Sequence, residues 1–130
     1  MDTNTKIALN DALQQIRDAW NKGYETGTDL ANARTMQRYI IATRIKTKRM
    51  EKGLSQEKLS EKINANALTY KGYENCKSDI PTVYLVRIAN VLDTTVDYLV
   101  GRTDEPTPTE TAIEERLKKL EAMVYEKSID

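Results

Sequence analysis

The feature that most constrains the fold is a pair of short helical segments in the stretch "GLSQEKLSEKINANALTYKGYENCK", residues 53–77. Ser55 and Asn66 are favourable N-cap residues, because their side-chain oxygens accept hydrogen bonds from backbone N–H groups that a helix start leaves free. Ser55 therefore begins one predicted helix, which ends near Ile63, and Asn66 begins another, which runs to Glu74. Only a short turn separates them, so the two helices must pack on one another.

The apolar residues of this pair predict where the helices meet. Leu59, Ile63 and Tyr70 fall where two crossing helices share a buried surface, and Ala65 is small enough for a close turn. Gly53 stands just after the preceding helix, in the position where glycine most often ends a helix.

Helix signals continue after the pair. Pro81 or Thr82 begins a helix, and Thr95 caps a last short one, "VDYLV", which Gly101 ends. The apolar face of the first of these is Leu85, Ile88, Ala89 and Leu92. Residues 40–101 are therefore predicted to form five helices around one core.

Residues 1–39 are predicted to be an N-terminal helical extension. Its first helix ends near Gly23, and a second run begins at Thr28 or Asp29 and continues to Lys52, either as one long helix or as two pieces. The first helix has an apolar stripe at helical spacing, formed by Leu9, Leu13, Ile16 and Trp20.

The chain is predicted to end in a linker and a helix. Residues 102–110, with two prolines and polar neighbours, form the linker, and residues 111–130 form a C-terminal amphipathic helix opened by a capping box of Thr111 and Glu114. Its apolar stripe is Ile113, Leu117, Leu120 and Val124.

Composition supports an all-α fold and excludes several functions. Apolar residues make up 39% of the chain and aromatic residues 6%, with no Phe, which suits a small helical protein with a charged surface. The chain has no His, one Cys and no Gly-rich phosphate loop, so we expect no enzyme activity, no metal site and no cofactor. A single Cys cannot form an internal disulfide, and no stretch resembles a membrane span or secretion signal, so a cytoplasmic location is expected.

Charge is unevenly distributed although the net charge is zero. Residues 40–100 carry ten basic and seven acidic side chains, whereas residues 101–130 carry five basic and eight acidic ones. The middle of the chain can therefore face an anionic partner more easily than its C-terminal part.

Three motifs resemble the phage repressor/Cro (Xre-type) helix-turn-helix transcriptional regulator family. They are "RIKTKRMEKGLSQEKLSEKI", the pair "YEN" and "SDIP", and "IANVLDTTVDYLVGRTD", and they follow one another at the family's spacing over about residues 40–104. The resemblance implies a five-helix lambda-repressor-like domain, to which this chain adds an N-terminal and a C-terminal helix.

The resemblance also implies which residues meet double-stranded DNA. The third helix of the domain would enter the major groove, and the second would cross the phosphate backbone. Arg49 would pair with Glu74 and tie the motif together. The residues implied to contact DNA are Gln56, Asn66, Ala67, Leu68, Thr69, Lys71, Lys77 and Ser78.

The predicted recognition helix departs from the family pattern at several positions. Ala67 and Leu68 cannot hydrogen-bond a base edge and can contact only a thymine methyl group, while Gly72 supplies no side chain. Cys76 replaces the glycine expected in a left-handed conformation, which implies strain or a shifted helix end. Asp79 adds a negative charge to a loop that should approach phosphates.

Two functional hypotheses follow from these residues. The first is a homodimeric, sequence-specific DNA-binding regulator, a repressor, whose dimer contact is one of the two terminal stripes, although either stripe could instead dock on the chain's own core. The second is a protein-interaction module, or an antitoxin with a protein partner, that keeps the fold with weak or no DNA binding.

Overall fold

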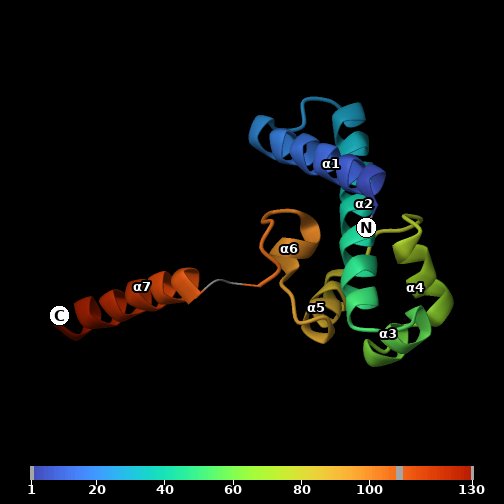
Figure 1. Ribbon diagram of the computed structural model, residues 1–130. Coiled ribbons are helices and arrows are strands. Elements are labelled where there is room, and N and C mark those ends of the chain that lie inside the picture. Colours follow the sequence, from blue (N-terminus) through green and yellow to red (C-terminus); the bar gives the residue numbers. More distant parts are fainter. Residues whose placement is uncertain (1, 108–109, 130) are drawn as a thin grey trace.

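The computed structural model describes residues 2–107 and 110–129, apart from the side chains at 110–112 and 127–129. Within these residues the chain is helical and has no strand, in agreement with the predicted all-α class. The helices are α1 (Thr3–Lys22), α2 (Gly27–Glu51), α3 (Gln56–Lys62), α4 (Ala67–Glu74), α5 (Thr82–Val91), α6 (Val96–Val100) and α7 (Glu110–Ile129) (Figure 1).

The second helical run is a single long helix. Thr26, not Thr28 or Asp29, is its N-cap: the Thr26 side chain accepts from the Asp29 backbone N–H, and the Asp29 side chain accepts from the Thr26 N–H. This reciprocal capping box holds Gly27 in the first turn, so Gly27 begins α2 instead of separating two helices. The domain boundary predicted between residues 39 and 40 lies within this continuous helix.

The main hydrophobic core lies between the C-terminal half of α2 and the helices α3–α6. Its largest fully buried side chains include Ile45, Leu59, Ile63 and Tyr70, so the apolar residues predicted for the helix pair are in the interior. In Figure 1, α3 and α4 lie on one side of α2 and α5 and α6 on the other.

The N-terminal half of α2 forms a second core with α1. Leu9, Leu13 and Ile16 are buried there against Ala33 and Ile40. Trp20 is partly buried against the same cluster. Leu9, Leu13 and Ile16 of the apolar stripe of α1 are therefore covered by the chain's own α2.

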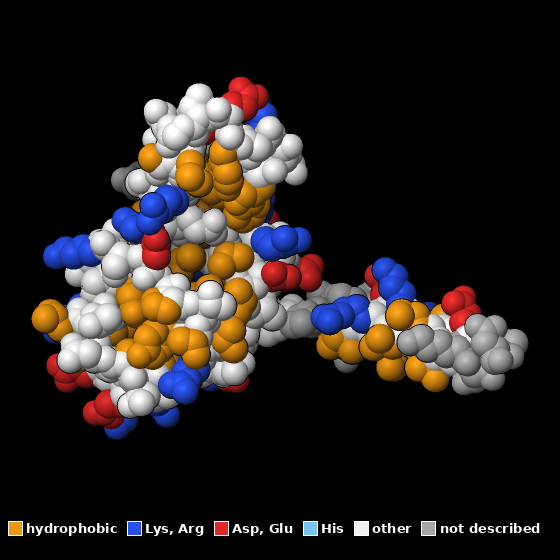
Figure 2. Space-filling view, turned by 180° about the vertical axis from the view of Figure 1, so that it is seen from behind, with side chains coloured by type: hydrophobic (Ala, Val, Ile, Leu, Met, Phe, Trp, Pro, Cys, Tyr) orange, Lys and Arg blue, Asp and Glu red, His pale blue; other side chains and the backbone are white. Residues whose placement is uncertain are grey.

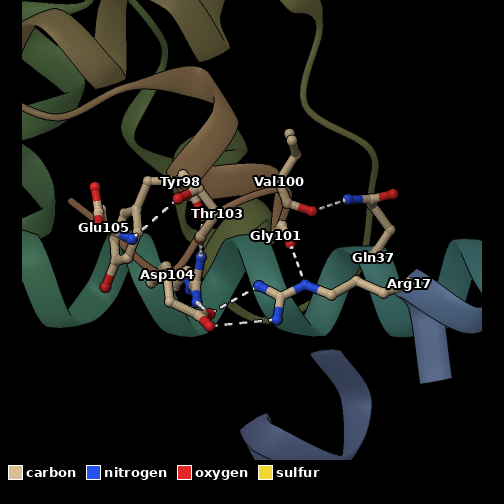
Figure 3. A network of polar contacts seen from close by, with 9 residues as sticks. Arg17, Gln37, Tyr98, Val100, Gly101, Thr103, Asp104 and Glu105 are labelled. Atoms are coloured by element: carbon tan, nitrogen blue, oxygen red, sulfur yellow. Dashed lines mark hydrogen bonds and ion pairs between the residues drawn. The ribbon is translucent and has the colours of Figure 1, made fainter. Parts of the chain in front are cut away.

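A polar network fixes α1 and α2 to the end of α6 (Figure 3). Arg17 donates from Nε to the Gly101 carbonyl at 2.8 Å and from Nη2 to Asp104 Oδ1 at 2.7 Å. Arg44, which is buried, donates to the carbonyls of Tyr98 and Thr103 and to Asp104. Its guanidinium also lies 4.1 Å from the centre of the Tyr98 ring, a cation–π contact.

Gly101 is required by two constraints at this junction. Its φ is +96°, and a Cβ atom added to it would lie 3.0 Å from Leu13 Cδ2. Any other residue would therefore be strained and would push against α1. The sequence predicted a helix end at Gly101, but the close approach of α1 is visible only in the structure.

Helix α7 lies apart from the helix bundle (Figure 1). The side chains of its predicted stripe, Ile113, Leu117, Leu120 and Val124, are between 52% and 65% exposed. Figure 2 shows hydrophobic side chains gathered along this helix. The cap expected of Thr111 lies outside the described side chains. Among the residues that the structure describes, no helix is both long and apolar enough to cross a bilayer.

Candidate nucleic-acid interface

Helices α3 and α4 form a helix-turn-helix whose geometry follows from its caps. The Ser55 hydroxyl oxygen accepts from the Lys58 N–H at 3.0 Å and starts α3. The turn that follows places Asn64 at a φ of +57°, and the Ala65 N–H then bonds the Ser60 carbonyl at 2.9 Å. Asn is one of the few non-glycine residues that adopt this left-handed conformation readily. Asn64 therefore suits the left-handed position in the turn between α3 and α4.

Asn66 is the N-cap of α4 and caps the helix with its side-chain oxygen. Its Oδ1 accepts from the backbone N–H groups of Leu68 at 2.9 Å and Thr69 at 3.4 Å. The amide oxygen is therefore committed to the cap, and the exposed Asn66 side chain keeps its NH₂ group as a donor.

The two faces of α4 differ sharply in exposure. Tyr70, Tyr73 and Glu74 are buried and face the core, and burial raises the pKa of Tyr70 above its ordinary value. The predicted DNA-facing residues lie on the opposite side. Leu68 is 78% exposed, Thr69 and Lys71 are exposed, and Ala67 is half-buried. Leu68 is the most exposed of the large apolar side chains that the structure describes.

Arg49 and Glu74 form the predicted ion pair beneath α4. Arg49 Nε lies 2.8 Å from Glu74 Oε2 and Nη2 lies 3.0 Å from Oε1, while Nη1 donates to the Leu54 carbonyl at 2.7 Å. The two side chains are 10% and 1% exposed. The Glu74 carboxylate raises the pKa of Arg49, so the guanidinium stays charged in the interior.

Gln56 has a partner that the sequence did not predict. Its side-chain amide Nε2 lies 3.3 Å from Glu74 Oε1, so this half-buried residue extends the ion pair toward the start of α3. One of its two amide hydrogens is committed to Glu74, which leaves the other for a phosphate oxygen.

The end of α4 is a Schellman motif with a cysteine in place of glycine. Cys76 has a φ of +60°, the Cys76 N–H bonds the Tyr73 carbonyl at 3.3 Å, and the Lys77 N–H bonds the Gly72 carbonyl at 2.9 Å. The left-handed conformation expected at this position is present. Burial raises the pKa of the Cys76 thiol, so the group is a poor nucleophile.

The loop after α4 carries an arrangement that the sequence did not predict. Asp79 accepts from Arg34 Nη2 at 2.8 Å and from Arg38 Nε at 2.6 Å. These bonds lower the pKa of the Asp79 carboxyl. The carboxylate is therefore paired with two guanidinium groups of α2, and the exposed Lys77 lies on the same loop. The arginines precede Asp79 by 45 and 41 positions, so no local pattern could link them.

The fold and this site together contain a helix-turn-helix motif, formed by α3 and α4. Residues 45–99 match the family model described as "Helix-turn-helix", so this segment is a helix-turn-helix domain and the predicted resemblance is confirmed over it. The chain is also similar to the "Uncharacterized HTH-type transcriptional regulator YobD" of Bacillus subtilis (strain 168), with 38% identity over 69 residues. The alignment covers 53% of this chain and 62% of that protein. No solved structure matches the chain significantly.

Proposed function

We propose that this chain is a sequence-specific DNA-binding transcriptional regulator that acts as a homodimer and represses the promoter it occupies. The observation that carries the proposal is the exposed N-terminal face of α4, held rigidly by the buried Arg49–Glu74 pair and by the core beneath it. In a helix-turn-helix, this face of the second helix enters the major groove. Occupation of the groove excludes other proteins from the same promoter, so repression is the simplest regulatory effect.

The chemistry of this face favours contact with thymine methyl groups. Leu68 and Ala67 offer only apolar contact, and the C5-methyl of thymine is the apolar group in the major groove. Lys71 can donate to the acceptors of guanine or to a phosphate, and the NH₂ of Asn66 can donate to a base acceptor. Lys77, which is exposed, and the backbone N–H groups after it would bind phosphates, and such contacts position a protein on DNA without reading sequence.

A second copy of this chain is the occupant we propose for the apolar stripe of α7. Ile113 and Leu120 take the d positions of a heptad, and Leu117 takes an a position. Arg116 then takes a g position and Glu121 the following e position. In a parallel, in-register pair the g residue of one helix faces this e residue of the other, so two Arg–Glu pairs form.

An antiparallel pair is disfavoured by the same charges. In that arrangement e positions face e positions, and Glu114 and Glu121 would meet each other across the pair. The charge pattern therefore supports a parallel dimer with a two-fold axis along α7. A two-fold dimer would present two copies of α4 to half-sites, which in helix-turn-helix proteins lie about one helical turn apart.

A protein-binding role is the second candidate, and the observation that favours it is also the exposure of Leu68. A large exposed apolar side chain can anchor a protein partner as well as a thymine methyl. An antitoxin, which binds a partner protein and its own promoter, would combine the two roles.

Retardation of random duplex DNA at about 50 mM and about 200 mM salt separates these candidates. A DNA-binding regulator is expected to bind at the lower salt and to weaken steeply at the higher, because phosphate contacts release counterions. Lys71→Ala with Lys77→Ala should weaken binding, whereas the control Lys118→Ala with Lys119→Ala, on α7, should not. Absence of binding by the unmodified protein at low salt would contradict the DNA-binding proposal and leave the protein-binding candidate.

A further inference from the structure

The N-terminal half of α2 carries two arginines on the face that meets the loop after α4. Arg34 and Arg38 are four residues apart, so they lie one above the other on the same side of the helix. Both donate to the carboxylate of Asp79. Arg38, Ser78 and Asp79 also line one crevice of about 190 Å³ between α2 and the loop. Figure 1 shows this loop beside α2, at the end of α4.

The Asp79 carboxylate leaves most N–H donors of Arg34 and Arg38 available for another ligand. A guanidinium has five N–H donors, and Asp79 takes one from each arginine. The Arg34 side chain is 59% exposed and Arg38 is 30% exposed. With Lys77, the loop and the facing helix present three positive charges against the one negative charge of Asp79.

We propose that Arg34 and Arg38 form a phosphate-binding site that extends the DNA interface beyond the helix-turn-helix domain. The proposal rests on the DNA-binding function proposed above, because that function brings the duplex backbone past the loop after α4. Both arginines precede residues 45–99, the segment that matches the family model. The N-terminal extension therefore supplies contacts that the domain alone lacks.

Phosphate is the ligand that this geometry fits. The planar guanidinium matches two phosphate oxygens, and arginine is favoured wherever bidentate recognition of phosphate is needed. Asp79 fixes one edge of each guanidinium, so fewer side-chain rotamers are lost when the remaining N–H groups bind an anion. This role also accounts for an acidic residue in a loop that approaches DNA, since Asp79 orients two cations while offsetting only one of three nearby positive charges.

The salt dependence of binding to random duplex DNA tests this site. Each neutralised phosphate contributes about 0.9 to the slope of log K against log salt concentration. Arg34→Gln with Arg38→Gln should therefore lower the magnitude of the slope by about 0.9, and Arg34→Gln alone should lower it by a smaller amount. The control is Lys118→Gln with Lys119→Gln, which removes two positive charges from the exposed surface of α7.

Two contrary outcomes have different meanings. If the unmodified protein binds but the arginine variant has the same slope as the lysine control, the site is overturned and the DNA-binding function stands. If the unmodified protein does not bind at low salt, both are overturned. Circular dichroism checks that the double variant is folded; if it is not, the exposed Arg34→Gln alone decides, with an unchanged slope counting against the site.

Discussion

At the scale of single residues, the ion pair of Arg49 and Glu74 determines whether α4 keeps its place. Glu74→Ala should destabilise the domain by about 3–5 kcal/mol, because the Arg49 guanidinium would remain buried without a counter-charge. Urea unfolding followed by circular dichroism measures the difference.

The matched control for this prediction is Glu61→Ala. Glu61 pairs with Lys58 at 3.6 Å, but both side chains are more than 60% exposed, so the loss should stay within about 1 kcal/mol. Equal unfolding midpoints for the two variants would show that the buried pair does not hold the motif together.

The residues in and around α4 show which contacts of the site could be predicted from the sequence and which could not. The caps at Ser55 and Asn66 and the Arg49–Glu74 pair were predictable, because they follow from local chemistry or from the family pattern. For Cys76 the sequence left strain or a shifted helix end open, and the structure shows the left-handed conformation. The partners of Asp79 and Gln56 were not, since both depend on side chains distant in sequence that only the folded chain brings together.

At the scale of helices, Gly72 lowers the stability of α4, and a substitution there should raise it. Gly72→Ala should stabilise the protein by about 0.5–1 kcal/mol, because alanine has the higher helix propensity. The added Cβ would meet only Ser78 Oγ within 4 Å, at an ordinary distance of 3.7 Å. The same substitution at Gly101 should destabilise, because of its positive φ and the 3.0 Å contact with Leu13. Thermal unfolding measures both variants: the unfolding temperature should rise for Gly72→Ala and fall for Gly101→Ala. A shift in the same direction for both would contradict these predictions.

Helix α7 provides a test of the proposed parallel dimer by charge exchange. Arg116→Glu should weaken dimerisation, since acidic residues would then face Glu121 of the second copy. Combining it with Glu121→Arg should restore the dimer, because the two charges are exchanged. Analytical ultracentrifugation measures the dimer dissociation constant of each variant. Each restored Arg–Glu pair should contribute about 0.2–1 kcal/mol to the free energy of dimerisation. If the double variant dimerises no more tightly than Arg116→Glu alone, the parallel arrangement is excluded.

The two apolar stripes illustrate why helices were easier to predict than their contacts. Periodicity identified both stripes, but the same pattern fits a helix docked on its own chain and a helix that meets a partner. The structure shows that the two stripes differ in burial: Leu13 and Ile16 are covered by α2, whereas Leu117 and Leu120 are exposed. A pattern within one helix contains no information about which other surface covers it.

At the scale of the whole molecule, Asp104 joins the N-terminal extension to the helix-turn-helix domain. Hydrogen bonds from Arg17, and then from Arg44, lower the pKa of the Asp104 carboxyl below its ordinary value. A carboxyl with a lowered pKa stabilises the folded state above its unfolded pKa of about 4, and this contribution is lost as pH falls through the folded value.

Asp104→Asn should therefore lower the unfolding free energy near neutral pH and have progressively less effect as the solution is acidified below about pH 4. Urea unfolding of both proteins across this range gives the difference directly. A difference that is independent of pH would mean that the charge of Asp104 does not hold the two parts together.

Selection of bound duplexes from a random pool tests whether α4 reads DNA as part of a two-fold dimer. Two-fold-symmetric sites whose half-sites are centred about 10 base pairs apart should be enriched. Thymine should be preferred where Leu68 meets the groove, and Leu68→Gln should remove that preference. A pool that gains no common sequence after repeated selection by the unmodified protein would contradict the claim.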